Sequence, residues 1–282
     1  MRLVWRGRTP PARFWSFTIR RNCARLEQIR QEFVGNVSHE LKTPLSVIKA
    51  SVETLLDGAA DDANYRDSFL KRIEEQADRL HALILDLLSL NRIESGTEVF
   101  DFQPVPLATV VLSAVDRQRG RAEAKKQNLL VMVPDGRGGF QPFRDATAMP
   151  DLFAWADVDA VSQILDNLID NALKYTPEKG TITVRWFASG GNACLQVEDT
   201  GIGIPQADLP RIFERFYRVD KARSRELGGT GLGLAIVKHL TQAMRGSVQV
   251  RSEIGAGTTF TVSLPLASSS EFFALPSSKL HR

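Results

Sequence analysis

The segment from Ser38 to Pro44 places an imidazole, a carboxylate and a hydroxyl group close together on a predicted helix. His39 and Thr43 are four positions apart and therefore share one helix face, and Glu40 is next to the histidine. A neutral imidazole is a competent nucleophile, and an adjacent carboxylate can orient it and stabilise the cation formed on attack. These residue types suit nucleophilic chemistry at His39, although the segment alone leaves the matter open.

A stripe of amide side chains lies more than a hundred residues downstream, on a helix expected between Asp159 and Tyr175. Its members are Gln163, Asn167 and Asn171, and Lys174 and Tyr175 follow them. Amide oxygens are hard, neutral ligands that suit Mg²⁺ carried in by phosphates, and a lysine one turn on can neutralise phosphate charge. From this helix alone, a solvated stripe of amides is the alternative.

Two glycine-rich segments follow. Asp199 to Pro205 comes directly after an apolar strand; its two glycines allow close backbone approach to a flat ligand, and its aspartate can accept from an exocyclic amine. Gly228 to Leu234 opens a helix expected to reach Met244, and so offers backbone N–H groups to phosphate. The second segment lacks both the surrounding βαβ unit of a dinucleotide site and the lysine ending of a P-loop.

The segment between the glycine-rich stretches carries arginines and aromatic residues. We expect Phe216 and Tyr217 to anchor a polar lid over residues 219–227. The candidates to reach phosphates on closure are Arg218, Arg223 and Arg225. Arg211 and Arg215 are expected on a solvated surface.

Two long amphipathic helices are predicted upstream, over residues 22–56 and 64–94, with a proline-induced kink just after His39. A short connection makes them a helical hairpin, whose apolar stripe has only one partner within the chain. A symmetric dimer that forms a four-helix bundle covers the rest. The alternative is a hairpin packed on the following domain.

The remainder predicts an α+β sandwich, with helices on one face of a mostly antiparallel sheet. Expected helices cover 107–126, 159–175 and 231–244, and expected strands cover 98–102, 128–133, 153–156, 181–188, 194–198, 247–252 and 258–264. Residues 134–150 are expected to be an exposed loop, and residues 268–282 a disordered tail.

Charge and composition limit the class of protein. The chain is 43% hydrophobic and 24% charged, as is ordinary for a globular protein, and its net charge of +3 gives no reason to expect a nucleic-acid partner.

Residues 1–30 hold eight arginines and one glutamate. We expect residues 1–24 to be a disordered or juxtamembrane leader, since Pro10 and Pro11 interrupt any helix there. No apolar run is long enough to span a membrane. Cys23 and Cys194 lack metal-type spacing and are interpreted as incidental thiols.

Taken together, five segments resemble the sequence boxes of the sensor histidine kinases of bacterial two-component systems, most closely the phosphate-regulon sensor type. They occur in the family's order between about Leu26 and Leu266. Phe33 to Pro44 resembles the H box, Asn167 to Tyr175 the N box, Asp199 to Pro205 the first glycine box, Phe213 to Tyr217 the F box and Gly229 to Gly233 the second glycine box.

The resemblance implies a dimerisation and histidine phosphotransfer domain over residues 25–95 and a catalytic ATP-binding domain of the Bergerat (GHKL) type over residues 96–267. His39 is then the phosphoacceptor, Glu40 its acid/base, and Thr43 the residue that positions water when a response regulator is dephosphorylated. Asn171, supported by Asn167, is the implied Mg²⁺ ligand. The other implied ATP-binding residues are Lys174 at phosphate, Tyr175 beside adenine, Asp199 at the adenine amino group, and Gly201, Gly203, Arg218, Gly229, Thr230, Gly231, Leu232 and Gly233 around the pocket.

The implied partners are a second copy of the chain and the receiver domain of a response regulator. The family usually has membrane helices before the H box, so we expect either a cytoplasmic kinase or a part of a longer sensor at the cytoplasmic face of the inner membrane. Two alternatives are an ATPase clamp of the same superfamily, which the H box disfavours, and a non-catalytic dimeric signalling module, which the intact N box and glycine boxes disfavour.

Overall fold

The computed structural model describes residues 12–135, 137, 139–143, 152–220 and 228–267, with side chains from residue 31 onward. The chain divides into two compact units, Met1–His81 and Ala82–Arg282. The C-terminal part of the second helix therefore belongs to the second unit. The expected tail at 268–282 and the expected lid residues Arg223 and Arg225 lie outside the described residues.

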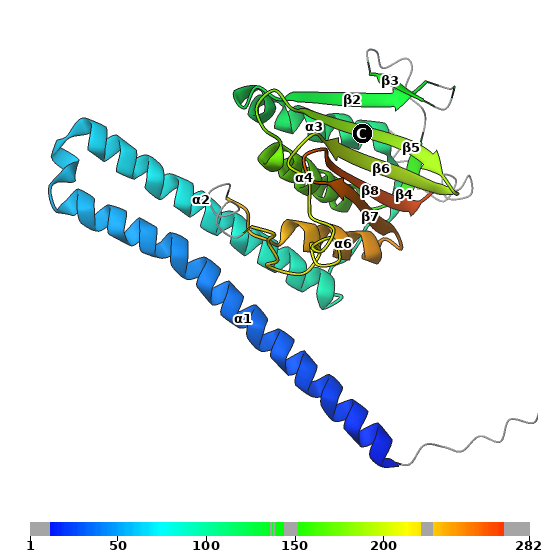
Figure 1. Cartoon of the computed structure of the whole chain (residues 1–282), viewed down its shortest axis with the longest axis horizontal. Coiled ribbons are helices and arrows are strands. Elements are labelled where there is room, and N and C mark those ends of the chain that lie inside the picture. The colour runs from blue at the N-terminus through cyan, green and yellow to red at the C-terminus, as the bar shows by residue number, and fades with distance from the viewer. Residues whose placement is uncertain (1–11, 136, 138, 144–151, 221–227, 268–282) are drawn as a thin grey trace, which may run out of the picture. The chain divides into compact units, whose positions relative to one another are not determined.

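The first unit is the predicted helical hairpin (Figure 1). Helix α1 spans Ala12–Leu56, a short 3₁₀ turn η1 spans Ala59–Asp61, and α2 spans Ala63–Glu94. Gly58 allows the chain to reverse because it adopts a φ of 112°, which a residue with a side chain rarely takes. The Asp62 carboxylate accepts from the Asn64 amide at 2.8 Å and so satisfies a free donor at the start of α2.

Helix α1 begins earlier than the sequence predicts. Its described part starts at Ala12, so residues 12–24 of the disordered or juxtamembrane leader expected over residues 1–24 are helical. Pro44 lies inside α1, which continues through it as one element. Within the described residues, no helix is long and apolar enough to cross a membrane.

The described strands of the second unit form a six-stranded sheet with the order β3-β2-β5-β6-β8-β7, and among these strands only β2 and β5 run parallel. A separate two-stranded ladder joins β1 to β4. The strands are β1 Gln103–Pro106, β2 Asn128–Pro134, β3 Phe140–Pro142, β4 Phe153–Ala156, β5 Thr181–Ser189, β6 Asn192–Asp199, β7 Ser247–Glu253 and β8 Gly257–Pro265.

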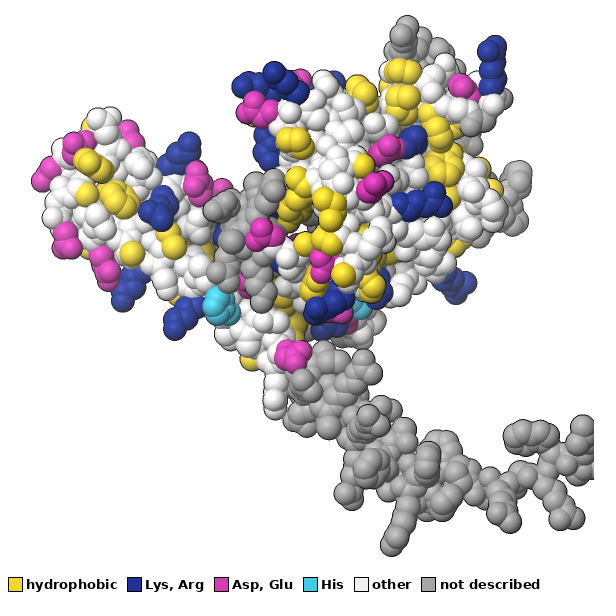
Figure 2. Space-filling view, in the orientation of Figure 1, with side chains coloured by type: hydrophobic (Ala, Val, Ile, Leu, Met, Phe, Trp, Pro, Cys, Tyr) yellow, Lys and Arg dark blue, Asp and Glu magenta, His cyan; other side chains and the backbone are white. Residues whose placement is uncertain are grey.

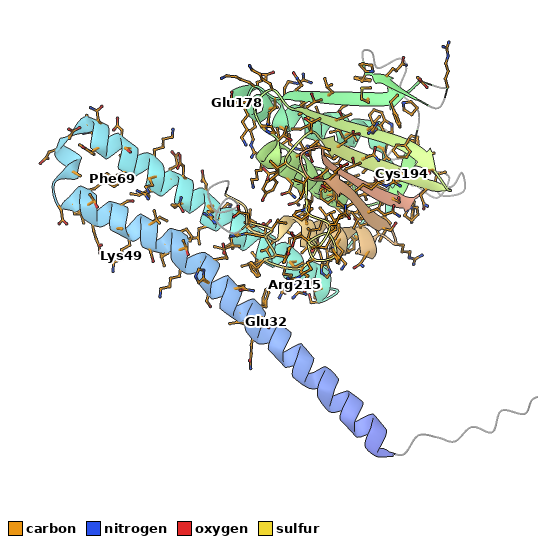
Figure 3. All side chains as sticks on the ribbon, viewed as in Figure 1. Glu32, Lys49, Phe69, Glu178, Cys194 and Arg215 are labelled. Carbon is orange, nitrogen blue, oxygen red and sulfur yellow. The ribbon has the colours of Figure 1, made fainter. Side chains whose placement is uncertain are left out.

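Among the described residues, three helices cover one face of the sheet: α3 Leu107–Ala124, α4 Val158–Tyr175 and α6 Gly233–Ala243 (Figure 1). The core lies between these helices and the sheet, where the largest fully buried side chains include Trp186, Ile164, Leu165, Leu168, Ile169, Leu173, Leu195 and Ile236. Cys194 is also buried, as a free thiol on β6 (Figure 3). The predicted order of a helical hairpin followed by an α+β sandwich with helices on one face is confirmed.

One strand prediction and one loop prediction are corrected. Residues 98–102 are not a strand; Val99 is 92% exposed, and the rings of Phe100 and Phe102 pack against each other instead. The strand begins at Gln103, in a two-stranded ladder that tolerates its two prolines. The region expected to be a loop over 134–150 contains β3, a short edge strand paired antiparallel with the end of β2.

Candidate functional site

The predicted phosphoacceptor segment lies on one turn of α1. His39 is exposed, and the Thr43 hydroxyl donates to its backbone carbonyl at 3.1 Å. The Glu40 carboxylate lies 3.7 Å from the guanidinium of Arg79 on α2, and the two side chains are only 15% and 16% exposed. Sequence analysis missed Arg79. The imidazole is thus open to an incoming group, while its neighbouring carboxylate is anchored on the opposite helix.

A cavity of about 540 Å³ in the second unit brings together most of the predicted ATP-site residues. Those that line it are Asn167, Asn171, Lys174, Tyr175, Asp199, Gly203, Arg218, Gly229, Thr230, Gly231 and Gly233. Two predicted residues do not line it, Gly201 and Leu232. Leu232 is fully buried in the core, so it supports the loop from beneath.

Asp199 ends β6 at the wall of this cavity and is 8% exposed. Burial raises the pKa of its carboxyl, although hydrogen bonds from the backbones of Gly201 and Thr258 oppose the rise. The Gly201 amide donates to it at 2.8 Å. A Cβ at Gly201 would lie 2.6 Å from that carboxylate oxygen and 2.7 Å from the Tyr175 carbonyl. Gly201 therefore acts by allowing Asp199 and the end of α4 to approach.

The amide stripe of α4 faces the same cavity because its other face is buried against the sheet. Asn167 donates through Nδ2 to the Gln163 carbonyl at 2.9 Å, and a Cβ at Gly233 would meet its Oδ1 at 2.5 Å. The Asn171 side-chain amide has no hydrogen-bond partner among the described residues. An amide group without a partner in a cavity is available to a ligand.

Lys174 and Asp170 form an ion pair one helical turn apart on α4, with Nζ 2.7 Å from Oδ2. Arg121 of α3 binds the other carboxylate oxygen at 2.6 Å. Burial by itself would raise the pKa of Asp170, but the two cations outweigh burial and hold the pKa below its usual range. Neither Asp170 nor Arg121 was predicted from the sequence, since both acids and arginines are common on helix surfaces.

The second glycine box precedes α6, whose first turn offers free N–H groups. Gly231 has a φ of 76°, and a Cβ there would lie 2.9 Å from the Phe216 backbone. The Phe216 amide donates to the Gly231 carbonyl at 2.8 Å, and Arg218 donates to the Gly229 carbonyl at 2.7 Å. The F box and the glycine box therefore hold each other in place, and Arg218 lies in the cavity as predicted.

The C-terminal part of α2 also contributes to the cavity, which sequence analysis missed. Asp86 accepts from the Thr230 hydroxyl at 2.9 Å and lines the cavity. Burial raises the pKa of Asp86, opposed by this hydrogen bond and by the charge of Lys174. A single acid inside the apolar run from Leu83 to Leu88 is the signal that could have identified it.

Two charged side chains and a histidine meet at the end of α2. Arg215, labelled in Figure 3, forms an ion pair with Glu94, and His239 of α6 lies 3.3 Å from the same carboxylate. Burial lowers the pKa of His239, although Glu94 acts in the opposite direction. The expectation that Arg215 is solvated is wrong, because its side chain is 32% exposed and ion-paired. Arg211 is on the surface as expected, where its guanidinium covers the Tyr217 ring at 4.3 Å.

Comparison with known proteins matches both units to described domains. The model of the His Kinase A (phospho-acceptor) domain matches residues 29–96, and that of the histidine kinase-, DNA gyrase B- and HSP90-like ATPase matches residues 156–268. Together these matches cover well over half of the chain.

Relatives agree with these matches. The sensor histidine kinase WalK of Bacillus subtilis is 38% identical over 243 residues, which is 86% of this chain and 37% of that protein. The phosphate regulon sensor protein PhoR of Pseudomonas aeruginosa is 39% identical over 236 residues, 84% of this chain and 50% of that protein. Full-length ShkA in complex with AMPPNP is a structural neighbour with a TM-score of 0.59 and 29% identity, over 84% of this chain and 46% of that one. This chain thus spans half or less of the length of these relatives.

Proposed function

Because the chain belongs to the sensor histidine kinases, we propose that it transfers the γ-phosphoryl group of ATP to His39 and then supplies this group to an aspartate of a response regulator. One observation carries the proposal. A single cavity brings together the amide stripe of α4, the buried Asp199 and both glycine boxes, although these lie far apart in the sequence. The neighbour ShkA, which resembles this chain at 29% identity, holds AMPPNP in its structure.

In the proposed site, Asp199 accepts a hydrogen bond from the adenine amino group and Tyr175 flanks the base. The phosphates extend toward Lys174 and the glycine box that precedes α6, where backbone N–H groups favour anions. Gly203 allows the neighbouring loop to pack closely, since a Cβ there would lie 2.0 Å from the Glu253 carbonyl. Arg218 adds a cation on the same side of the cavity.

The side chains present fit Mg²⁺. Asn171 offers an amide oxygen with no hydrogen-bond partner among the described residues, and Asn167 retains its Oδ1. Hard oxygen donors of this kind, combined with phosphate oxygens, suit this cation. When bound, Mg²⁺ neutralises phosphate charge and favours phosphoryl transfer. Asn171 is the proposed principal ligand, and Asn167 the supporting one.

Transfer itself requires positioning more than covalent assistance. A nitrogen of the His39 imidazole forms a bond to the γ-phosphorus, the bond from that phosphorus to its bridging oxygen breaks, and ADP leaves with the electron pair. Glu40 receives the imidazole proton. The exposure of His39 supports this role, because an acceptor must be reached first by the nucleotide and then by the regulator.

We further propose that the hairpin forms a homodimer. Large apolar side chains remain exposed on it among charged ones (Figure 2), namely Val34, Leu45, Val52, Leu56, Tyr65 and Leu70. Burial of such a stripe against a second copy is favourable. Thr43 is proposed to position water when the phosphorylated regulator is dephosphorylated. The proposed location is cytoplasmic, at the inner face of the inner membrane where a longer parent protein exists.

The proposal is tested by incubation of the purified chain with γ-labelled ATP and Mg²⁺, followed by addition of a receiver domain. We expect label on the chain that is labile in acid and stable in base, that maps to His39 by mass spectrometry, and that passes to the receiver aspartate. Continuous release of phosphate without a labelled protein would instead indicate an ATPase clamp. Failure to bind nucleotide would indicate a non-catalytic module.

A further inference from the structure

The carboxylate of Asp170 is shared by two cations that come from different helices. Its Oδ2 is 2.7 Å from Lys174 Nζ on α4, and its Oδ1 is 2.6 Å from the Arg121 guanidinium on α3. The side chains of Lys174 and Asp170 are 17% and 26% exposed. All three residues line the cavity proposed for ATP. The lysine is thus fixed at both ends, by the helix at its Cα and by the carboxylate at its ammonium group.

A second pair, one turn earlier on the same two helices, shows what is special about Asp170. Arg117 of α3 donates to Asp166 of α4 at 2.9 Å, in the same arrangement as Arg121 and Asp170. No lysine contacts Asp166 in the described part of the chain. Both pairs join α3 to α4, so the joining of the helices alone does not explain why Asp170, unlike Asp166, also holds Lys174.

A lysine side chain is flexible, and it loses considerable rotamer freedom when it is fixed in one place. A carboxylate that holds the ammonium group before the nucleotide arrives removes most of this loss from the reaction itself. Arg121 forms an ion pair with the other carboxylate oxygen of Asp170. The carboxylate can therefore release Lys174 toward a phosphate oxygen without being left unpaired.

We propose that Asp170 is a positioning residue for phosphoryl transfer, which holds Lys174 at the phosphate end of the cavity while Arg121 balances its charge. The inference rests on the proposed function, since it assumes that the cavity takes ATP. It assigns Asp170 an action through Lys174, without contact to the nucleotide.

If Asp170 has this role, its substitution should change the affinity for nucleotide and the rate of autophosphorylation in different ways. The substitution Asp170→Asn removes a negative charge near the phosphates, so nucleotide affinity is retained or increased. The same substitution frees Lys174, so the rate of autophosphorylation at saturating ATP falls about 10- to 30-fold. A role limited to joining α3 and α4 would weaken binding and stability without such a divergence.

The experiment is a double-mutant cycle on the full chain. Initial rates of labelling from γ-labelled ATP, together with the dissociation constant of ADP, are measured for wild type, Asp170→Asn, Lys174→Met and the double variant. Asp166→Asn is the matched control, and Asp170→Glu tests whether a carboxylate restores the rate. We expect Asp170→Asn to lower the initial rate of labelling when Lys174 is present. In the Lys174→Met background, we expect the same substitution to cause no further loss of rate. Asp166→Asn stays within about twofold of wild type, and Asp170→Glu recovers part of the rate.

The inference would be overturned if Asp170→Asn lowered the labelling rate by the same factor in the wild-type and Lys174→Met backgrounds. It would also be overturned if Asp166→Asn lowered this rate as much as Asp170→Asn does. If Asp170→Asn fails to fold, it will no longer bind ADP, and Asp170→Glu then serves as the test. A labelling rate for Asp170→Glu that is no higher than that of Lys174→Met would overturn the positioning role of Asp170. If wild type binds ADP but takes no label, the proposed function itself fails, and that result is distinct from any difference among the variants.

Discussion

The phosphoacceptor segment and the nucleotide cavity are constructed in opposite ways. On α1, His39, Glu40 and Thr43 lie within one helical turn, and the imidazole is exposed. The cavity instead collects Asn171 from α4, Asp199 from β6 and Thr230 from a loop, and these come together only when the sheet and its helices pack. Local spacing is sufficient to display the acceptor, whereas the cavity depends on long-range packing.

This contrast implies different sensitivity to change. On α1, substitution of a single side chain removes one chemical group and leaves the helix in place. Around the cavity, many positions serve the nucleotide indirectly, by allowing other groups to approach. Gly201 makes room for Asp199, Gly231 for Phe216, and Gly233 for Asn167. The predictions below test whether the two regions fail in these separate ways.

The largest effect is expected at Asn171. The substitution Asn171→Ala removes the proposed Mg²⁺ ligand from the cavity and leaves the buried face of α4 intact. Calorimetry should show loss of Mg²⁺-dependent ATP binding with little change in thermal stability. Normal affinity in this variant, with the same dependence on Mg²⁺ as wild type, would contradict the assigned ligand.

A second substitution tests the packing of the cavity. Gly203 has a φ of 71°, and a Cβ there would lie 2.0 Å from the Glu253 carbonyl. Gly203→Ala should therefore lower the free energy of unfolding of this unit by about 3 kcal/mol. Gly190→Ala is the control, since Gly190 has a φ of 58° but no atoms within 4 Å, and it should cost about 1 kcal/mol. Denaturant unfolding of both variants measures the difference, and equal losses would show that close packing at Gly203 is unimportant.

Asp86 tests the part of the cavity that α2 supplies. Because burial raises the pKa of Asp86, the folded protein binds a proton there more tightly than the unfolded chain does. The ionised carboxylate therefore lowers stability above the raised pKa, and this cost disappears as the pH falls below the unfolded value. Asp86→Asn should raise Tm by about 2 °C at neutral pH and by less as the pH falls. Thermal melts across this range decide the matter, and a Tm gain that grows on acidification would contradict the assignment.

The smallest effect on phosphorylation is expected at Thr43. Its hydroxyl donates to the His39 carbonyl within the same exposed helix, so Thr43→Ala should leave the autophosphorylation rate within about twofold of wild type. Dephosphorylation of the labelled regulator should slow markedly. Both rates can be followed in one time course, and equal loss of the two activities would refute the separation of roles.

The contrast between the regions also explains what the sequence could predict. Regular apolar spacing identified the hairpin and the helix that carries Asn167 and Asn171, because both depend on helical periodicity alone. Glycine spacing identified both loops of the cavity. These signals were sufficient for the fold class, and most of the ATP-site residues that they predicted line the cavity.

The errors arose where tertiary contacts outweigh local pattern. Residues 98–102 were expected to form a strand, but no described strand pairs with them, and pairing begins at Gln103 opposite Ala156. Arg215 was expected on a solvated surface, and its ion-pair partner Glu94 is too distant in the chain to be identified from sequence spacing. Asp170 was overlooked for the same reason, because one of its two cationic partners, Arg121, comes from α3.

The central claim is that one region supplies the acceptor and the other supplies the nucleotide. The most direct measurement compares nucleotide affinity and incorporation of label from γ-labelled ATP in His39→Gln and Asn171→Ala, side by side with wild type. We expect His39→Gln to bind ATP as tightly as wild type but to take no acid-labile label, and we expect Asn171→Ala to lose both properties. Acid-labile label on His39→Gln, or full labelling of Asn171→Ala, would contradict it.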